Sequence, residues 1–219
     1  VGNDVTFTTR GNLAIGTATK ATATNKVVGV SAGLTASVSF NATSDVTVTQ
    51  QIGFGTNARL TADGTMTITA GADPAAVAPT GITVASTVDG ETGGAITFID
   101  VVAKPTLTNT STVTFGTGAV VGSGGNMRLA ADPGRPSVTG DGRVTYYDLE
   151  ALWDWLTGQE NVKRATDVPQ QTNTSRVTLA GSFTAGHQAN VSLTIPADFG
   201  SGTLTGTPAV VANAPVTAT

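Results

Sequence analysis

The chain has 219 residues, of which 12% are charged and 5% aromatic, with 27 glycines, no cysteine and a formal net charge of −4 at pH 7. The scattered Lys and Arg argue against nucleic-acid binding, which needs a concentrated basic surface, and no apolar run approaches the roughly 18 residues of a membrane span. Abundant Thr and Val favour extended backbone, so we expect an all-β protein rather than a disordered chain. The chain opens at Val1 without Met or a signal peptide, and we expect a processed or excised piece.

Three windows of the sequence align with one another without a gap. They are "VGNDVTFTTRGNLAI" (1–15), "FGTNARLTADGTMTI" (54–68) and "FGTGAVVGSGGNMRL" (115–129). Two glycine and two apolar positions coincide in all three: Gly2, Gly55 and Gly116; Gly11, Gly64 and Gly125; Leu13, Met66 and Met127; Ile15, Ile68 and Leu129. Similarity at a period of roughly 50 to 60 residues is typical of repeat architectures.

Within each copy, apolar and polar residues alternate with a period of two, which predicts strands with one buried face. Glycine marks a corner before each run. Such a unit buries its core by stacking on copies of itself, as in a solenoid. With coils of about 20 to 28 residues, each unit is two or three coils, on the order of seven for the chain. The alternative is an antiparallel β-sandwich, in which strands recur through hairpin turns.

Two stretches carry a family resemblance, "GNLAIGTATKATATNKVVGVSAGLTASVSFNATSDVTV" and "GTMTITAGADP". They resemble the passenger repeats of giant filamentous-haemagglutinin-like bacterial surface proteins, over residues 1–131 and more loosely over 175–219. The resemblance implies a right-handed parallel β-helix, or β-solenoid, that is extracellular or at the cell surface and acts in adhesion or in building a filament. It supplies no catalytic motif.

Between residues 132 and 174 the pattern breaks, and we predict an inserted loop and helix there. The β-solenoid coils of 1–131 then continue in the same domain over 175–219. Four apolar residues at helical spacing form one stripe, which we expect to pack on the flank of the solenoid: Leu149, Leu152, Trp153 and Leu156. Asp148 is placed to cap this helix, and Gly158 to end it.

The segment "SVTGDGRVTYYD" resembles the calcium loop of EF-hands and dockerins, with Asp141 at position 5, Gly142 at 6 and Asp148 at 12. Ser137 and Thr139 stand where further carboxylates or amides are expected, so the metal site is degenerate. The other interpretation is a turn followed by a helix cap. We expect no other cofactor.

Both Trp and both Tyr lie between Gly140 and Gln159. Trp155 lies on a different face of the predicted helix from Trp153. Trp155, Tyr146 and Tyr147 are therefore the candidates for contact with a neighbouring chain or a cell-surface sugar, since exposed aromatic residues often anchor interfaces.

The chain has one His and no Cys, so we expect no thiol or His-cluster chemistry and no enzyme. Four threonine-rich stretches with Thr-x-Thr pairs, "TFTT", "TVTQ", "TMTIT" and "TLTNT", suggest an ice-binding solenoid as a further alternative. We expect those pairs to lack a common phase relative to the repeat glycines. The leading interpretation is a structural or adhesive segment of a large secreted repetitive protein, with neighbouring modules or copies of itself as partners. The alternative is a carbohydrate-binding module that uses the helix aromatics.

Overall fold

The computed structural model describes residues 1–71, 81–158, 161–166, 168–193, 203–212 and 216–218, most of them in strands. The elements are β1 (Thr6–Thr9), β2 (Leu13–Thr17), β3 (Ala21–Ala32), β4 (Thr35–Phe54), β5 (Arg59–Ala62), β6 (Met66–Gly71), β7 (Ile82–Gly93), β8 (Ile96–Ser123), β9 (Met127–Asp132), β10 (Ser137–Tyr147), α1 (Leu149–Thr157), β11 (Val162–Arg164), β12 (Gln170–Ala185), β13 (Ala189–Leu193), β14 (Thr203–Ala212) and β15 (Val216–Ala218).

The strands form three sheets. The long sheet runs β1-β5-β8-β12-β14, with β4 also paired to β8 and β15 to β12; the arm sheet runs β11-β10-β7-β3 and the base sheet β13-β9-β6-β2. In the described residues every pairing is parallel except that of β10 with β11. The all-β prediction is confirmed, and the antiparallel sandwich is wrong. The chain passes through corners from the long sheet (β1) to the base sheet (β2), then to the arm sheet (β3) and back to the long sheet (β4).

Strand register reproduces the repeat alignment residue by residue. Leu13 pairs with Met66 and Met66 with Met127, the same positions that coincide in the three aligned windows. One repeat copy thus forms one layer, meaning one pass of the chain through the three sheets. The expectation of two or three short coils in each copy is wrong, because β3 and β4, of 12 and 20 residues, extend each layer into a long excursion.

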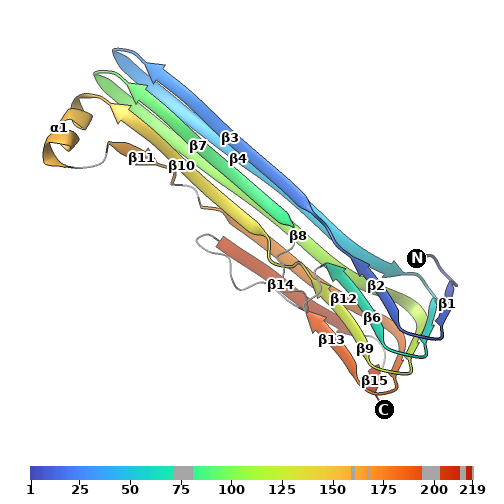
Figure 1. Ribbon diagram of the computed structural model, residues 1–219. Coiled ribbons are helices and arrows are strands. Elements are labelled where there is room, and N and C mark those ends of the chain that lie inside the picture. Colours follow the sequence, from blue (N-terminus) through green and yellow to red (C-terminus); the bar gives the residue numbers. More distant parts are fainter. Residues whose placement is uncertain (72–80, 159–160, 167, 194–202, 213–215, 219) are drawn as a thin grey trace.

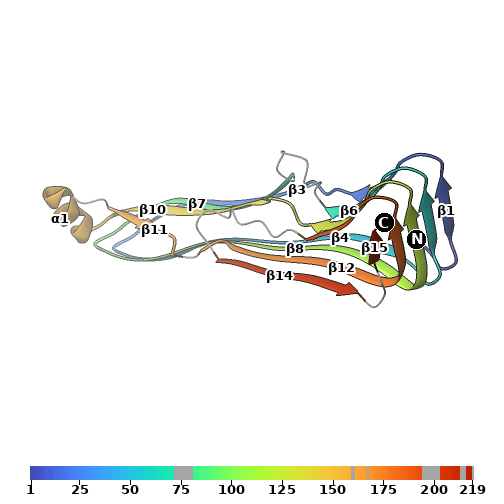
Figure 2. The same ribbon diagram turned by 90° about the horizontal axis from the view of Figure 1, so that it is seen from below.

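The molecule is elongated along its strands rather than along the stack of layers (Figure 1). At about 3.3 Å per residue, β4 alone spans about 65 Å. Figure 2 shows the arm sheet facing the long sheet along most of this length, an arrangement we call the arm. At the other end the base sheet joins them at the corners, while α1 lies at the tip of the arm.

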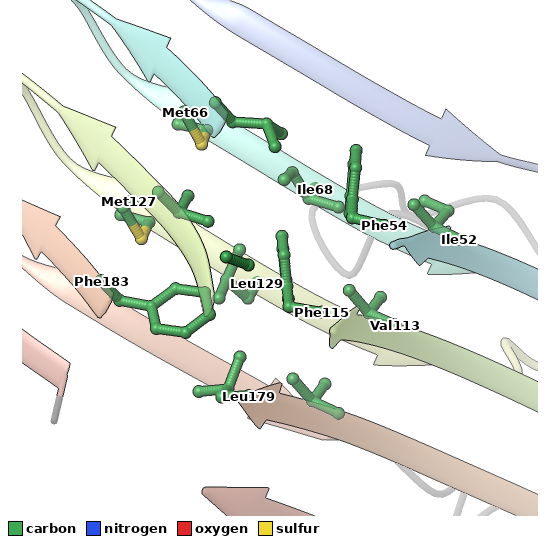
Figure 3. Close-up of a cluster of buried hydrophobic side chains, with 14 of the residues drawn as sticks. Ile52, Phe54, Met66, Ile68, Val113, Phe115, Met127, Leu129, Leu179 and Phe183 are labelled. Atoms are coloured by element: carbon green, nitrogen blue, oxygen red, sulfur yellow. The ribbon is translucent and has the colours of Figure 1, made fainter. Parts of the chain in front are cut away.

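The main core fills the space between the base sheet and the long sheet. Figure 3 shows its side chains repeating from layer to layer, with Met66 beside Met127 and Ile68 beside Leu129. The rings of Phe54 and Phe115 stack with centroids 4.9 Å apart. Phe183 meets Phe115 edge-on at 5.0 Å. Equivalent residues in consecutive layers therefore bury each other.

Two smaller apolar clusters fill the arm. One surrounds Phe40, Val101 and Val144, the other Ile82 and Leu107.

Between these clusters and the main core, the interior of the long sheet is polar, with these side chains buried: Gln50, Asn109, Ser111, Gln171, Asn173 and Ser175. Asn109 Nδ2 donates to the carbonyl oxygen of Pro133 at 2.7 Å, so this polar zone ties the long sheet to the chain segment between β9 and β10.

Corners are held by short polar side chains and by close contact of the backbones. Thr56 N donates to Asn3 Oδ1 at 3.0 Å and Thr65 N to Asn12 Oδ1 at 2.9 Å, both from one layer to the next. A β-carbon on Gly116 would lie 2.7 Å from the carbonyl carbon of Gly55. Glycine recurs at these corners because consecutive layers leave no room for a side chain.

Residues 137–147, which the sequence pattern placed in an insertion, instead form β10. This strand pairs in parallel with β7 over its whole length, from Ser137 opposite Thr83 to Tyr147 opposite Gly93. The regular layer therefore continues to Tyr147, and the departure from it begins with α1. The antiparallel strand β11 then covers part of the outer edge of β10.

Replacing Gly116 with Ala tests the corner contact. We expect a loss of about 1–3 kcal/mol in the free energy of unfolding, because the methyl group would overlap backbone atoms of Gly55 and Thr56 at the corner of the adjacent layer. Thermal denaturation followed by circular dichroism measures it, with an expected fall in Tm of several degrees.

Gly122 is the matched control, since it lies in the same strand and a β-carbon there meets nothing within 4 Å. Gly122→Ala should leave stability unchanged or raise it slightly, because Ala restricts the unfolded chain. Equal destabilisation by the two variants would contradict a steric origin for the corner glycines.

Candidate functional site

The helix α1 begins and ends where its sequence predicts. Ala151 N donates to Asp148 Oδ1 at 2.8 Å, which makes Asp148 the N-cap. The other carboxylate oxygen, Oδ2, accepts from Thr97 Oγ1 on β8. Gly158 follows the last helical residue with a φ of +75°, the left-handed conformation typical of a helix end. Asp148 thus both starts the helix and fastens it to the arm.

The apolar stripe of α1 does not pack on the flank of the sheets, and that prediction is wrong. Its four members are 56–70% exposed: Leu149, Leu152, Trp153 and Leu156. Only Ala151 is buried among the helix residues whose side chains the structure describes. The reason is positional, because α1 follows the last paired residue of β10 and lies beyond the ends of the arm strands (Figure 1). No sheet face in the described part of the chain extends far enough to cover the stripe.

The predicted contact residues lie at this tip. Tyr147 is 56% exposed, Tyr146 is half-buried, and the side chain of Trp155 lies outside the described part of the structure. Next to Tyr147 is an open hollow of about 440 Å³ between the turn at Gly94 and Ala95 and the helix residues Leu149 and Leu152. The tip therefore combines exposed aromatic and aliphatic side chains around a shallow depression, as partner-binding surfaces do.

The structure does not bring the predicted calcium ligands together. Asp141 lies within β10 and Asp148 follows its end. The six residues between them are extended strand, which puts the two α-carbons about 23 Å apart, whereas a calcium loop wraps its ligands around one ion. Across the described ranges, no group of three or more His, Cys, Asp or Glu side chains is arranged to hold a metal. Asp148 instead fits the other interpretation, a turn followed by a helix cap.

The outer face of the long sheet carries two rows of threonine that the sequence interpretation missed. Strand register places Thr-x-Thr pairs of β4, β8, β12 and β14 directly beside one another. The rows, called the threonine rows below, are Thr47, Thr108 and Thr172, and Thr49, Thr110 and Thr174; the backbone register continues into β14 at Thr205 and Thr207. In β4 both threonines are exposed, and in the central strand β8 both are half-buried between their neighbours.

The stretches "TVTQ" and "TLTNT" therefore share one phase, contrary to the expectation, whereas "TFTT" in β1 and "TMTIT" at β6 lie outside the rows. The signal was present in the sequence, since Thr47 and Thr108 each lie eight residues before the repeat glycines Gly55 and Gly116. It was obscured because other pairs, such as Thr6 and Thr8 in β1, belong to different strands. When the pairs are aligned by strand partner, those of the threonine rows separate from those in other strands.

Comparisons of the chain with protein-family models, with curated proteins and with solved structures found no match. Among the residues that the structure describes, no helix combines the length and apolarity that crossing a bilayer requires.

Substitution of Asp148 tests how the tip is held. Asp148→Ala should cost about 1 kcal/mol of local helix stability because the N-cap is lost, which corresponds to about fivefold faster hydrogen exchange at the amide of Ala151. Asp148→Asn is the matched control, since Asn caps helices about as well as Asp. Similar exchange rates in the two variants would contradict the capping role.

Proposed function

We propose that this chain is a structural and adhesive segment of a large secreted β-solenoid protein, with a right-handed parallel coil, that works without catalysis at the cell surface. Its partners are neighbouring layers, supplied by adjoining modules or by another copy. The observation that carries the proposal is the unfinished core of the first layer.

Inward-facing apolar residues of the first layer are only partly covered. Leu13 and Ile15 are half-buried, while Met66 and Ile68, their partners in the next layer, are fully buried. In the arm, Val27 is half-buried, whereas its partner Val88 is 2% exposed. Because burial of apolar surface is the main stabilising contribution of such side chains, a further layer on this side would complete the core.

The strand edges of the same layer support the same conclusion. Within the described residues β1, β2, β3 and β4 each pair with one neighbour only, so their opposite edges are open. Open edges of this length favour pairing with another chain. On the opposite side of the stack, β13 and β14 also pair with one described neighbour each, but in the arm sheet β11 runs antiparallel along β10 and covers part of its edge. We infer that further layers are added at the side of β1 to β4.

A proline at the open edge of β3 tests this. Ala21 N donates to Gly81 O, just before β7, and in a parallel strand alternate residues direct both backbone groups to the same side. The backbone groups of Thr24 therefore face the open edge. Thr24→Pro should leave the fold intact and weaken concentration-dependent self-association, measured by light scattering after size exclusion.

Ala23→Pro is the comparison, since the amide of Ala23 faces β7 and its loss breaks a bond within the sheet. It should lower Tm, whereas Thr24→Pro should not. A wild-type chain that stays monomeric at high concentration, with the same mass as Thr24→Pro, would count against stacking between copies.

Carbohydrate binding by the tip of the arm is the second candidate. It is favoured by the exposure of Tyr147 and of Trp153, which is 66% accessible, since aromatic faces stack on sugar rings through apolar contact. If it is right, a glycan array should show binding that Tyr147→Ala and Trp153→Ala each reduce. Phe7→Ala is the control, because Phe7 is also half exposed but lies in β1 at the opposite end (Figure 1). Equal binding by all variants would remove the tip as the site.

A further inference from the structure

We propose that the threonine rows form an ice-binding surface, so that the outer face of the long sheet adsorbs to crystalline water. This inference does not depend on the structural role proposed above. It rests on the register of four strands and on the chemistry of the residues along them.

The rows make a two-dimensional lattice of like side chains. Neighbouring threonines across the strands lie about 4.8 Å apart, and the two rows lie about 6.6 Å apart along the strands. Register is continuous through both rows, with Thr47 opposite Thr108 and Thr108 opposite Thr172. β14 extends it, since Thr172 pairs with Thr205. Repeats of this size are comparable to those between water oxygens in planes of ice.

Threonine supplies what an ordered water layer needs. Its hydroxyl both donates and accepts hydrogen bonds, while its methyl group restricts the orientations of adjacent water. Branching at the β-carbon limits rotation about χ1, so each hydroxyl holds its position with little loss of side-chain entropy. A regular set of hydroxyl and methyl groups can then organise water into an array that continues into the crystal.

Charge also favours this partner. Neither row contains a charged residue, whereas Asp45 and Arg176 occupy outward positions just before and just after the rows. Charged side chains hold hydration water in their own arrangement, which would disturb an ordered water layer. A surface without charges therefore suits contact with ice. A dissolved ligand would instead need a concave site with converging polar groups, and the rows follow one face of a sheet.

Strand propensity alone does not explain the rows. Threonine favours strands everywhere, and the arm sheet offers an internal comparison with the same kind of parallel pairing. Its outward positions mix residue types across the strands, with Lys26 beside Thr87 and Asp141, and Val28 beside Asp89 and Arg143. Uniform threonine occurs on the long sheet, where strands of four layers lie side by side (Figure 2).

The test is thermal hysteresis and uptake into a growing ice hemisphere, measured on the full chain and its variants. The wild type should open a gap between melting and freezing points and enter the ice. Thr110→Lys places a charge in the centre of the lattice, on the middle strand β8, and should abolish both effects. Thr49→Lys, on the exposed strand β4, repeats the test with less crowding in the sheet.

Thr83→Lys is the matched control. Thr83 is a half-buried outward residue of the middle strand β7, between the hydroxyl residues Thr22 and Ser137, and this variant should keep full activity. Circular dichroism confirms that each variant folds. A folded wild type with no hysteresis and no uptake would overturn the proposal, as would equal loss in Thr49→Lys and Thr83→Lys. Adsorption to crystalline cellulose or chitin but not to ice would overturn it in favour of a polysaccharide.

Discussion

Each repeat pairs in parallel with its own equivalent in the next layer, and this pairing sets the positions of the interior, corner and surface residues. Main-chain hydrogen bonds between layers align residues one repeat apart, as Leu13, Met66 and Met127 show. Apolar residues of the main core therefore have apolar neighbours in the adjacent layers. The packing of the interior, the glycines at the corners and the threonine rows on the outer face all result from this arrangement.

In the interior, alignment lets large side chains bury one another. Phe54 stacks on Phe115 because their strands pair in register. At the corners the same closeness excludes side chains, which is why Gly55 and Gly116 contact each other through backbone atoms. On the outer face it places Thr47 beside Thr108, so a repeat that stabilises the core also creates a regular surface.

Where parallel pairing between layers ends, apolar side chains are no longer fully buried. β10 is the last strand of the arm sheet to pair in parallel, and α1 begins directly after it. The helix is held by the cap at Asp148 and by the bond to Thr97 rather than by burial of its apolar stripe. At the opposite side of the stack, Leu13 and Val27 are only partly covered because no further layer lies over them in the described residues.

Features that depend on local chemistry and on repetition could be predicted from the amino-acid sequence. Alternation with a period of two specified strands, the coincidence of Gly55 with Gly116 specified the alignment of layers, and Asp148 and Gly158 specified the ends of the helix. Each depends on neighbours along the chain or on a matching position one repeat away, and both are visible in the amino-acid sequence.

Three features became known from the fold alone: the length of a layer, the exposure of the apolar stripe with Leu152 and Trp153, and the set of threonines that share a face. Alternation is the same in a short coil and in a strand of 20 residues, so it does not show where the chain turns. An apolar stripe shows that a helix has two faces but not that a sheet reaches it. Thr47 and Thr172 are brought together by pairing across two layers, through contacts between segments that are remote in sequence.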